Sequence, residues 1–263
     1  MDFSLEGFKQ VFPVHQAYTA SACSMAHSTE PWVCSQANVS IAYITTPLFV
    51  AEALTDRVVT HGHADHARGG HGRTVATPET LAIMELRYRT GAADDAGEIP
   101  HRAEPVAYGE TIRLMGGVDA TYIPAGHVLG SAQILLEHAG ERIVVTGDYK
   151  RRPDPTCPPF EVTPCDIFIT EATFGLPVFT HPPIANEMAK LTDRLAAHPD
   201  ACVLVGAYAL GKAQRVIAEL RAAGHSDPIY LHGAMERMCR LYEEHGVDLG
   251  ELRLVADHSK DDM

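Results

Sequence analysis

The chain has 263 residues, of which 46% are hydrophobic, and its formal net charge is −13. This length and apolar content exclude a chain that is disordered by composition, and they allow one large α/β domain or a domain with a partial second one. The negative charge excludes a protein that coats nucleic acid with a uniformly basic face, but it allows a nuclease that meets phosphate through metal ions and a local basic loop.

The sequence gives no sign of a membrane span or of export. Its most apolar segment, residues 41–54, is shorter than the roughly 18 residues that a spanning helix needs and contains a proline. The opening MDFSLEGFKQ is acidic where a secretory signal is basic. The 6 cysteines form no CxxC pair. We therefore expect a cytoplasmic protein with reduced thiols and no membrane partner.

The first part of the chain is predicted to be rich in β-sheet. Short β-branched runs alternate with turns and predict strands at 57–60, 74–77, 110–114, 120–125, 131–138, 141–148 and 166–172. One helix is predicted over 78–89, because Pro78 suits a first helical turn. Leu81, Met84 and Tyr88 then fall on one helical face.

A different rhythm follows Pro183. Predicted helices at 184–198, 210–224 and 234–246 alternate with predicted strands at 202–208, 228–233 and 252–257. Such a βαβ order implies parallel strands covered by helices. The turn-rich residues 175–183 suggest a boundary, which gives predicted domains at 1–178 and 179–263.

A cluster of histidines follows the first predicted strand. His61, His63, Asp65 and His66 form the pattern HxHxDH. Residues two apart in an extended chain share a face, and a turn after His63 brings Asp65 and His66 back toward the same point. Neutral imidazole and carboxylate are donors that zinc accepts at about 2.0–2.2 Å. The cluster therefore predicts a metal site, with an unusual surface patch as the alternative.

Two further segments also place a possible metal ligand after a predicted strand. His127 lies in the glycine-rich IPAGHVLGS and Asp148 ends IVVTGDYK, each after a predicted strand. Taken alone, either residue is more often a turn residue or a cap than a ligand. Together with HxHxDH, they predict a site for two metal ions, in which a carboxylate at position 148 can bridge both.

Three cations are candidate phosphate contacts. Lys150 and Arg151 directly follow Asp148, and Lys212 begins a predicted helix in ALGKAQR. Basic side chains and free helical N–H groups both bind phosphate. The alternatives are a solvated turn for the first two and an ordinary helix start for the third. His232 is expected to be structural.

Longer stretches carry a family resemblance over about residues 57–240. HxHxDH followed by AGHVLGSA and TGDYK resembles the metallo-β-lactamase superfamily. The words THGHADHARGGHG, PAGHVLGSAQI, GDYKRRPDPTCPPFEVTPCDIFITEATFGLP and YALGKAQR are similar to the ligase-associated DNA exonucleases, relatives of the β-CASP nucleases. The resemblance implies an α/β (α+β) fold: an αββα sandwich with a partial β-CASP-like lobe that is truncated at its C-terminus.

The resemblance also implies roles for the site residues. His61, His63 and His127 match the ligands of a first zinc. Asp65, His66 and Asp148 match those of a second, with Asp148 bridging. The implied cofactors are two Zn²⁺, with Mn²⁺ as a substitute. A metal-bound hydroxide oriented by Asp65 then attacks phosphorus, and Glu171 in TEATFG supports proton transfer to the leaving oxygen.

The sequence departs from the family pattern in two places. The family has an Asp on the strand shortly before HxHxDH, whereas this chain has no acid there until Glu52. The family also continues into further histidine-bearing segments, and His258 has no such context. We therefore expect a poor match over residues 1–50 and a second zinc site that lacks a ligand.

Three functions follow as hypotheses. The first is a zinc-dependent DNA exonuclease of DNA repair, with DNA, an ATP-dependent DNA ligase and a DEXH-type helicase as partners. The second is an RNA-processing β-CASP nuclease or a small-molecule metallo-hydrolase such as a thioesterase. The region after residue 183 favours a polynucleotide enzyme, because a small ester requires no second lobe. The third is a non-catalytic, metal-poor scaffold that binds a partner.

Overall fold

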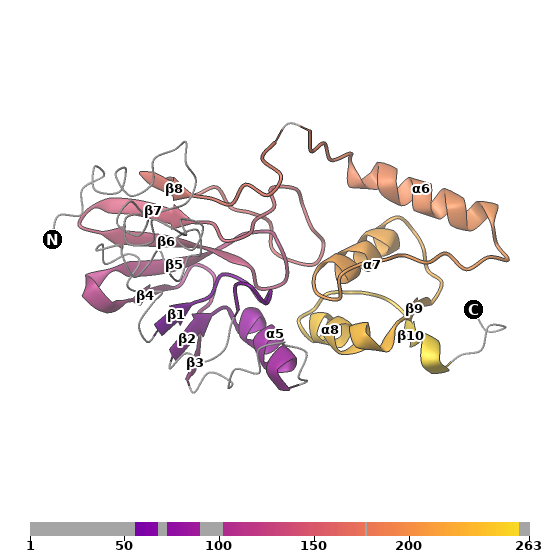
Figure 1. The fold of residues 1–263 in the computed structure, drawn as a ribbon, viewed down its shortest axis with the longest axis horizontal. Helices are drawn as coiled ribbons and strands as arrows, with labels where there is room; N and C mark the ends of the chain where they lie inside the picture. The colour runs from indigo at the N-terminus through magenta and orange to yellow at the C-terminus, as the bar shows by residue number, and fades with distance from the viewer. Residues whose placement is uncertain (1–55, 68–72, 90–101, 177, 258–263) are drawn as a thin grey trace, which may run out of the picture.

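The first lobe of the protein is a sandwich of two β-sheets (Figure 1). The computed structural model describes residues 56–67, 73–89, 102–176 and 178–257, so residues 1–50 and His258 lie outside the described part. The lobe contains β1 (Asp56–Val58), β2 (Arg73–Ala76), α5 (Pro78–Arg89), β3 (Ala103–Pro105), β4 (Thr111–Arg113), the 3-10 helix η2 (Met115–Gly117), β5 (Asp119–Pro124), β6 (Ala132–His138), β7 (Glu141–Val145) and β8 (Ile167–Ile169).

The two sheets differ in strand direction. One joins β1, β2 and β3 in parallel. The other has the order β4-β5-β6-β7-β8 and is antiparallel except for the parallel β7–β8 pair. The core between them combines buried side chains of both sheets and their loops: Val75, Val106, Leu114, Val118, Ala120, Tyr122, Ala132, Ile134, Leu136 and Ile143. This mixed architecture confirms the predicted α+β class.

The pattern of residues in the strands explains these layers. Along β5 the side chains alternate between half-buried and buried, as expected for a strand with one face in the core. In β6 the residues from Ala132 to Leu136 are all buried, which identifies a central strand covered on both faces. The sequence did not predict β3, because its residues Ala103–Pro105 include no β-branched side chain.

Helix α5 lies against the first sheet, beside the histidine-rich loop. It spans Pro78–Arg89, as predicted, and it buries Thr80, Ile83 and Met84. Met84 packs in a small cluster with Val59, Ala67 and Ala76. The helix therefore supports the loop that connects β1 to β2.

The second lobe contains α6 (Ile184–Ala197), α7 (Lys212–Ala222), β9 (Ile229–Leu231), α8 (Gly233–Glu244), β10 (Leu252–Leu254) and the 3-10 helix η3 (Val255–Asp257). β9 and β10 pair in parallel across α8, which confirms the βαβ order predicted for this part. The His232 side chain accepts a hydrogen bond from the Ala234 amide at 3.2 Å and caps α8. None of the described helices combines the length and the apolar character needed to cross a membrane.

The strand predicted over residues 202–208 is wrong. The structure has no strand there, and Leu204 is 90% exposed. Within the described residues β9 and β10 form a two-stranded sheet, and residues 202–208 pair with neither strand. An apolar run alone therefore does not establish a strand, because a strand also requires backbone pairing with a neighbour.

The two lobes share part of their core. Ile83 of α5 and Leu129 of the loop after β5 pack in one cluster with Ile217, Met238 and other residues of the second lobe. The Leu129 amide also donates to the Tyr242 hydroxyl at 3.4 Å. Contacts between the lobes therefore fall on the same loop that carries His127. The domain division at residues 178 and 179 stays a prediction.

Replacing Tyr122 with Phe removes a hydrogen bond between the two sheets. The buried phenol donates to the Val75 carbonyl at 2.8 Å, and that carbonyl also accepts from the Val59 amide at 2.8 Å. Because the carbonyl keeps one donor, we expect Tyr122→Phe to lower the free energy of unfolding by only about 1 kcal/mol. Urea unfolding measures this as a lower midpoint with an unchanged slope.

The matched control is Tyr208→Phe, whose ring is 76% exposed and whose midpoint should not change. An unchanged midpoint for Tyr122→Phe would show that the bond between the sheets contributes nothing.

Candidate metal centre

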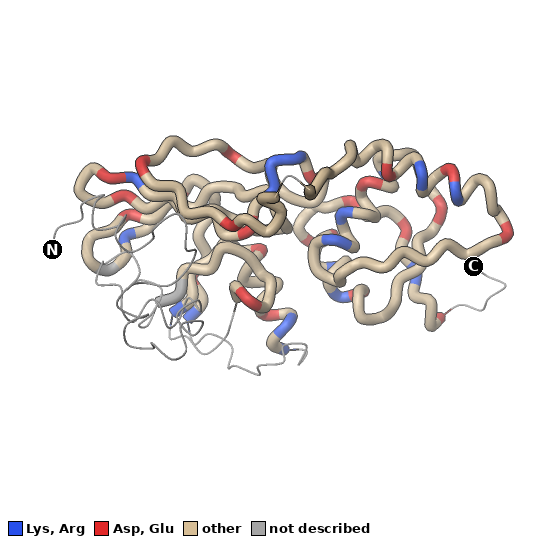
Figure 2. Tube along the Cα trace, turned by 45° about the horizontal axis from the view of Figure 1, so that its top comes forward, with Lys and Arg blue, Asp and Glu red and all other residues tan. Residues whose placement is uncertain are grey.

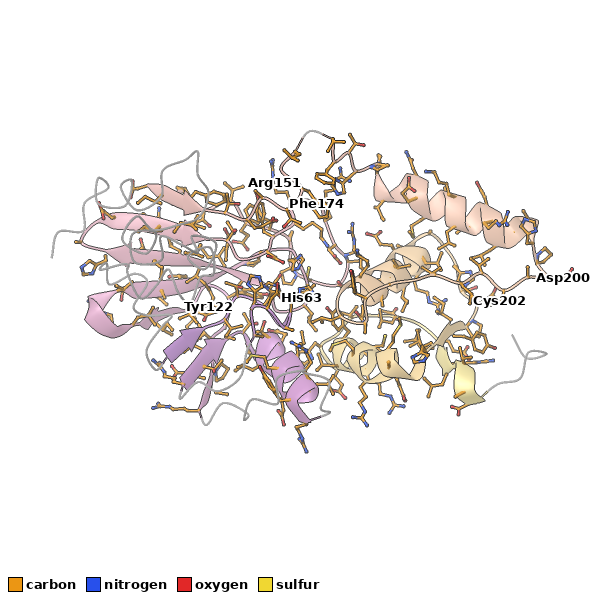
Figure 3. All side chains as sticks on the ribbon, in the orientation of Figure 1. His63, Tyr122, Arg151, Phe174, Asp200 and Cys202 are labelled. Carbon is orange, nitrogen blue, oxygen red and sulfur yellow. The ribbon has the colours of Figure 1, made fainter. Side chains whose placement is uncertain are left out.

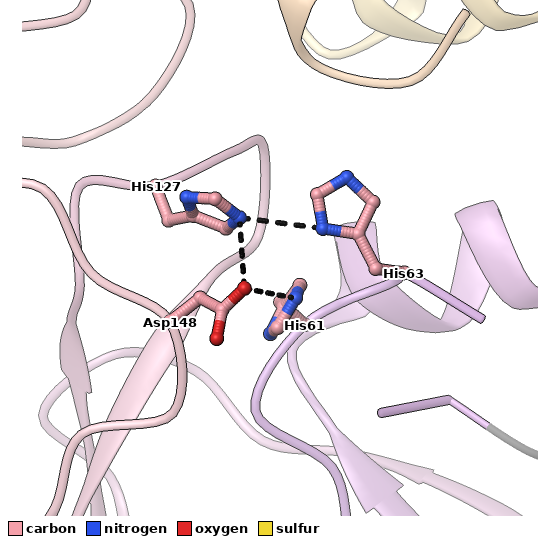
Figure 4. Close-up of side chains that lie close together, drawn as sticks. All are labelled: His61, His63, His127 and Asp148. Carbon is pink, nitrogen blue, oxygen red and sulfur yellow. Dashed lines mark hydrogen bonds and ion pairs between the residues drawn. The ribbon is translucent and has the colours of Figure 1, made fainter. Parts of the chain in front are cut away.

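Four of the predicted ligands converge on one point (Figure 4). Ligand atoms of His61, His63, His127 and Asp148 all lie within 4.8 Å of one another. His61, His127 and Asp148 each lie three residues beyond the last residue of a strand, namely β1, β5 and β7. The fold thus brings three strand ends together at one edge of the sandwich.

The distances within this group suit a single cation. The Asp148 Oδ2 atom is 3.5 Å from His127 Nε2 and 3.7 Å from His61 Nε2. His127 Nε2 is 3.3 Å from His63 Nδ1. A tetrahedral ion with bonds of about 2.1 Å separates its ligand atoms by about 3.4 Å. The buried His61 Nε2 atom has no hydrogen-bond partner within the described residues, so it is free to bind an ion.

Asp148 also faces a second group of predicted ligands. Its Oδ1 atom is 3.5 Å from His66 Nε2, which in turn is 3.7 Å from Asp65 Oδ2. The two carboxylate oxygens of Asp148 therefore point at different imidazole groups, as a bridging ligand requires. The side chain of Asp65 is 73% exposed and that of His66 is 32% exposed, so this group is the more open of the two.

Glu171 borders the same site. β8 runs parallel to β7, with Ile169 in register with Val145, so Glu171 and Asp148 leave neighbouring strands at the same edge. The carboxylate of Glu171 accepts the Thr173 amide at 2.6 Å, which fixes it in a tight turn. Glu171 thus lies close to Asp148 without being part of the four-residue group.

Thr60 orients two of the histidines, and the sequence did not predict this role. Its hydroxyl is 3.2 Å from His61 Nδ1 and 3.5 Å from His66 Nδ1, which leaves the Nε2 atom of each ring toward Asp148. Gly147 makes this possible, because a Cβ there would lie 2.6 Å from the Thr60 hydroxyl oxygen and its φ is +55°. The only signal in the sequence is a threonine just before the first histidine. Such outer partners commonly fix the tautomer of a metal ligand.

The loops that carry the histidines are held by backbone contacts. Arg87 of α5 donates to the Gly62 carbonyl at 2.9 Å, and the Tyr88 hydroxyl donates to the Ala67 carbonyl at 2.6 Å. After β5, the Ser131 hydroxyl accepts from the His127 amide at 2.9 Å. Helix α5 and a serine-capped turn therefore position the imidazoles before any ion binds.

The electrostatics of the site keep its imidazoles neutral. Burial, with smaller contributions from the other histidines, lowers the pKa of His61, and burial lowers the pKa of His127 to about 4. Burial also lowers the pKa of His63, while a hydrogen bond to the Leu210 backbone partly offsets this. Burial raises the pKa of Asp148, and Glu171 adds to that effect. Neutral imidazoles beside crowded carboxylates are the donor set of a divalent cation.

A buried ion cluster connects the His127 loop to the second lobe. Asp154, whose side chain is 2% exposed, pairs with Lys150 Nζ and lies 3.5 Å from Arg215 Nε of α7. Lys150 Nζ also donates to the His127 carbonyl at 3.4 Å. Beside it, Gly211 has a φ of +83°, and a Cβ there would lie 2.4 Å from Val128. The second lobe therefore helps to hold the loop of His127.

The three predicted phosphate contacts lie in different settings. The Lys150 ammonium faces Asp154, which favours a structural role. Arg151 is exposed and has no polar partner within the described residues. Lys212 is exposed, with its Nζ atom 5.1 Å from the centre of the Tyr208 ring. Contact of these cations with phosphate stays a prediction.

Comparison with known proteins agrees with this geometry. Residues 54–206 match the sequence profile of the Metallo-beta-lactamase superfamily. The chain is 34% identical over 194 residues to a probable DNA ligase of Opitutus terrae, covering 72% of the chain and 18% of that protein. It is 30% identical over 217 residues to an endoribonuclease YSH1 of Mycosarcoma maydis, covering 69% and 24%. It is 28% identical over 212 residues to the ribonuclease TTHA0252 of Thermus thermophilus, covering 70% and 48%.

The chain therefore spans less than half the length of each of these relatives. The matches confirm the resemblance that the histidine motifs indicated, both to the superfamily and to its nucleases.

The stability of the metal-free protein should fall as the pH drops from about 6.5 to about 4. His127 has a pKa of about 4 when folded and one near 6.5 when unfolded, so the unfolded chain binds more protons in this window. Asp148, with its raised pKa, acts with the opposite sign. Replacing His127 alone isolates the imidazole effect: His127→Asn should reduce the loss by roughly 1–3 kcal/mol.

Chemical unfolding in EDTA at a series of pH values measures this. Parallel pH profiles for the wild type and His127→Asn would contradict the proposed burial of a neutral imidazole.

Replacing Asp154 with Asn should weaken both the fold and the metal centre. The change leaves the half-buried Lys150 and Arg215 without their shared counter-charge. Because these cations keep some contact with solvent, we expect a loss of about 2 kcal/mol in unfolding free energy, below that of a fully buried pair. Zn²⁺ affinity should also fall, because Lys150 no longer holds the His127 carbonyl.

Denaturant unfolding and zinc titration measure the two effects. Asp200→Asn is the control, because Asp200 is exposed at the far end of the second lobe (Figure 3). Equal effects of the two substitutions would show that the buried cluster does not support the site.

Proposed function

We propose that this chain, which belongs to the metallo-β-lactamase superfamily, is a zinc-dependent nuclease that hydrolyses phosphodiester bonds of DNA. The observation that carries the proposal is the position of Asp148, whose two oxygens face two separate imidazole groups at 3.5–3.7 Å. One bridging carboxylate between two sets of ligands is the arrangement of a two-cation hydrolase.

The residues present fit two divalent cations. His61, His63 and His127 would hold one of them, and His66 with Asp65 would hold the other, while Asp148 would contribute an oxygen to each. The second group has only three such ligands within the described residues, in line with the expected second site that lacks one. Two such cations lower the pKa of water toward neutrality and offset the charge that develops on a phosphoryl oxygen. The nitrogen and oxygen donors favour Zn²⁺, with Mn²⁺ as a substitute.

The remaining acids would handle protons. Asp65 has an exposed carboxylate beside His66, where it can accept a hydrogen bond from water and orient it. Glu171 lies at the end of β8, next to Asp148, and is a candidate donor to the leaving 3′ oxygen. Thr60 and the Leu210 backbone fix the rings of His61 and His63, so that the reacting groups meet with little rearrangement.

Two polynucleotides compete as the substrate. The relative named as a probable DNA ligase supports DNA as the substrate and an association with a DNA ligase. An exonuclease of DNA repair beside an ATP-dependent DNA ligase and a DEXH-type helicase is the role that the resemblance of the sequence motifs implies. The relatives named as an endoribonuclease and a ribonuclease support RNA as the second candidate.

A nuclease assay on end-labelled single- and double-stranded DNA and RNA tests the proposal. We expect cleavage of DNA with added Zn²⁺ or Mn²⁺, none in EDTA, and close to two zinc ions per chain by elemental analysis. His63→Ala removes a nitrogen from the four-residue group and should lower the rate by at least ~100-fold, since ligand loss disables a metal centre.

His198→Ala is the matched control, because His198 is exposed at the end of α6. The cleavage rate of this variant should stay within about twofold of the wild-type rate. Activity that survives His63→Ala would exclude this site. Cleavage of RNA alone would favour the second candidate, and a purified chain without metal or activity would leave the scaffold hypothesis.

A further inference from the structure

Three exposed aromatic side chains lie on the segments that border the metal centre. Phe174, Phe179 and Tyr208 are 61%, 46% and 76% exposed. None of them belongs to the core of the first lobe or to the cluster that joins the two lobes. Exposed rings gathered beside a reactive centre indicate a binding surface.

Phe174 is attached to the edge of the site. It lies three residues after Glu171, which leaves the sheet beside Asp148, so the chain can carry it at most about 11 Å from that edge. A turn closed by the hydrogen bond from the Gly175 amide to the Ala172 carbonyl, at 3.0 Å, keeps it there. Figure 3 shows Phe174 and Arg151 at the junction of the two lobes.

The Phe174 ring is supported by other rings and by an arginine. It meets Phe179 at 5.4 Å and His181 at 5.1 Å, in each case edge to face. Arg152 donates to the carbonyls of His181 and Pro182, which ties this segment to the stretch that follows Asp148. The Phe174 ring is therefore held in position before a ligand binds, which lowers the entropic cost of binding.

Tyr208 approaches the site from the other lobe. It lies three residues before Gly211, which packs against Val128, the neighbour of His127. The Tyr208 carbonyl accepts the Ala213 amide at 3.1 Å, so the residue is joined to the first turn of α7. The Lys212 ammonium lies 5.1 Å from its ring centre.

Basic residues lie near two of these rings. Figure 2 shows a basic stretch, Lys150–Arg152, between the lobes, on a chain whose net charge is otherwise negative. Arg151 lies in the same region as Phe174 (Figure 3), and the Lys212 ammonium lies over the Tyr208 ring. An aromatic face next to a cation matches a nucleotide, because the base stacks on the ring while the phosphate pairs with the charge. A duplex cannot use such rings, since its bases are stacked on one another.

We propose that Phe174 and Tyr208 form a stacking subsite for unpaired nucleobases, with Arg151 and Lys212 binding the adjoining phosphates. The inference rests on the proposed function and narrows its substrate to single strands and frayed ends. The two rings belong to different lobes, so a strand stacked on both would span the junction of the lobes.

Binding in EDTA tests the subsite separately from hydrolysis. The probe is a short single-stranded DNA that contains 2-aminopurine, whose fluorescence falls when it stacks on an aromatic ring. We expect the wild type to quench the probe and to bind it at least ~10-fold more tightly than a blunt duplex. Phe174→Leu and Tyr208→Leu should each weaken binding about 10-fold and reduce the quench, in line with the loss of one stacked base.

Two further variants keep the result interpretable. Phe174→Tyr retains a ring and should restore both affinity and quench. Leu204→Ala removes an exposed apolar side chain from the same segment as Tyr208 and should change affinity by less than about twofold. Unchanged binding by both leucine variants, equal affinity for the duplex, or no binding by the wild type would each overturn the inference.

A substrate without bases separates this inference from the proposed function. Hydrolysis of bis(p-nitrophenyl) phosphate by the wild type, and its loss in His63→Ala, tests the metal centre alone. A wild type that hydrolyses this ester but binds single strand and duplex equally would keep the nuclease and remove the stacking subsite. A wild type that quenches the probe but does not hydrolyse this ester would keep the stacking subsite and remove the proposed nuclease.

Discussion

The carboxylate of Asp148 is the constraint on which the rest of the site depends. It is half-buried between imidazoles that burial keeps neutral, and burial, with a further contribution from neighbouring acids, raises its pKa. Polar groups that leave water without hydrogen-bond partners destabilise a fold, and His61 Nε2 is such a group. The sandwich tolerates this arrangement because rigid strand ends hold the ligands in place. Divalent cations would compensate both the crowded carboxylates and the unpaired ring nitrogens.

The second lobe takes part in building the centre. Asp154, Lys150 and Arg215 connect α7 to the carbonyl of His127, and the Leu210 backbone contacts His63. A shift of this lobe therefore moves two metal ligands as well as the surface that faces the substrate. Substrate binding across the junction and ligand geometry are coupled for this reason.

The sequence predicts the parts of the site that depend on neighbouring residues. The HxHxDH motif predicts that its histidines point the same way, because residues two apart at a strand end share a face. Helix α5 is predicted by the helical spacing of apolar residues after Pro78. The partnership of Thr60 with Gly147 could not be predicted, because it depends on two distant strands ending side by side. The sequence does not predict the Asp154 cluster either, because Arg215 is far from Asp154 along the chain. Residues 202–208 do not form the predicted strand, since an apolar run does not determine whether a segment pairs with a neighbouring strand.

The net charge of −13 constrains how this surface can recognise a polyanion. At physiological ionic strength a charge acts over about 8 Å, so the acids elsewhere on the chain are screened from a strand that lies over the centre. Close contacts must then supply the attraction. Divalent cations at Asp148, the exposed Arg151 and Lys212, and uncharged aromatic faces would all act within that range. The proposed nuclease, with its acidic chain, would therefore require local recognition, and the proposed stacking subsite supplies it at the junction of the two lobes.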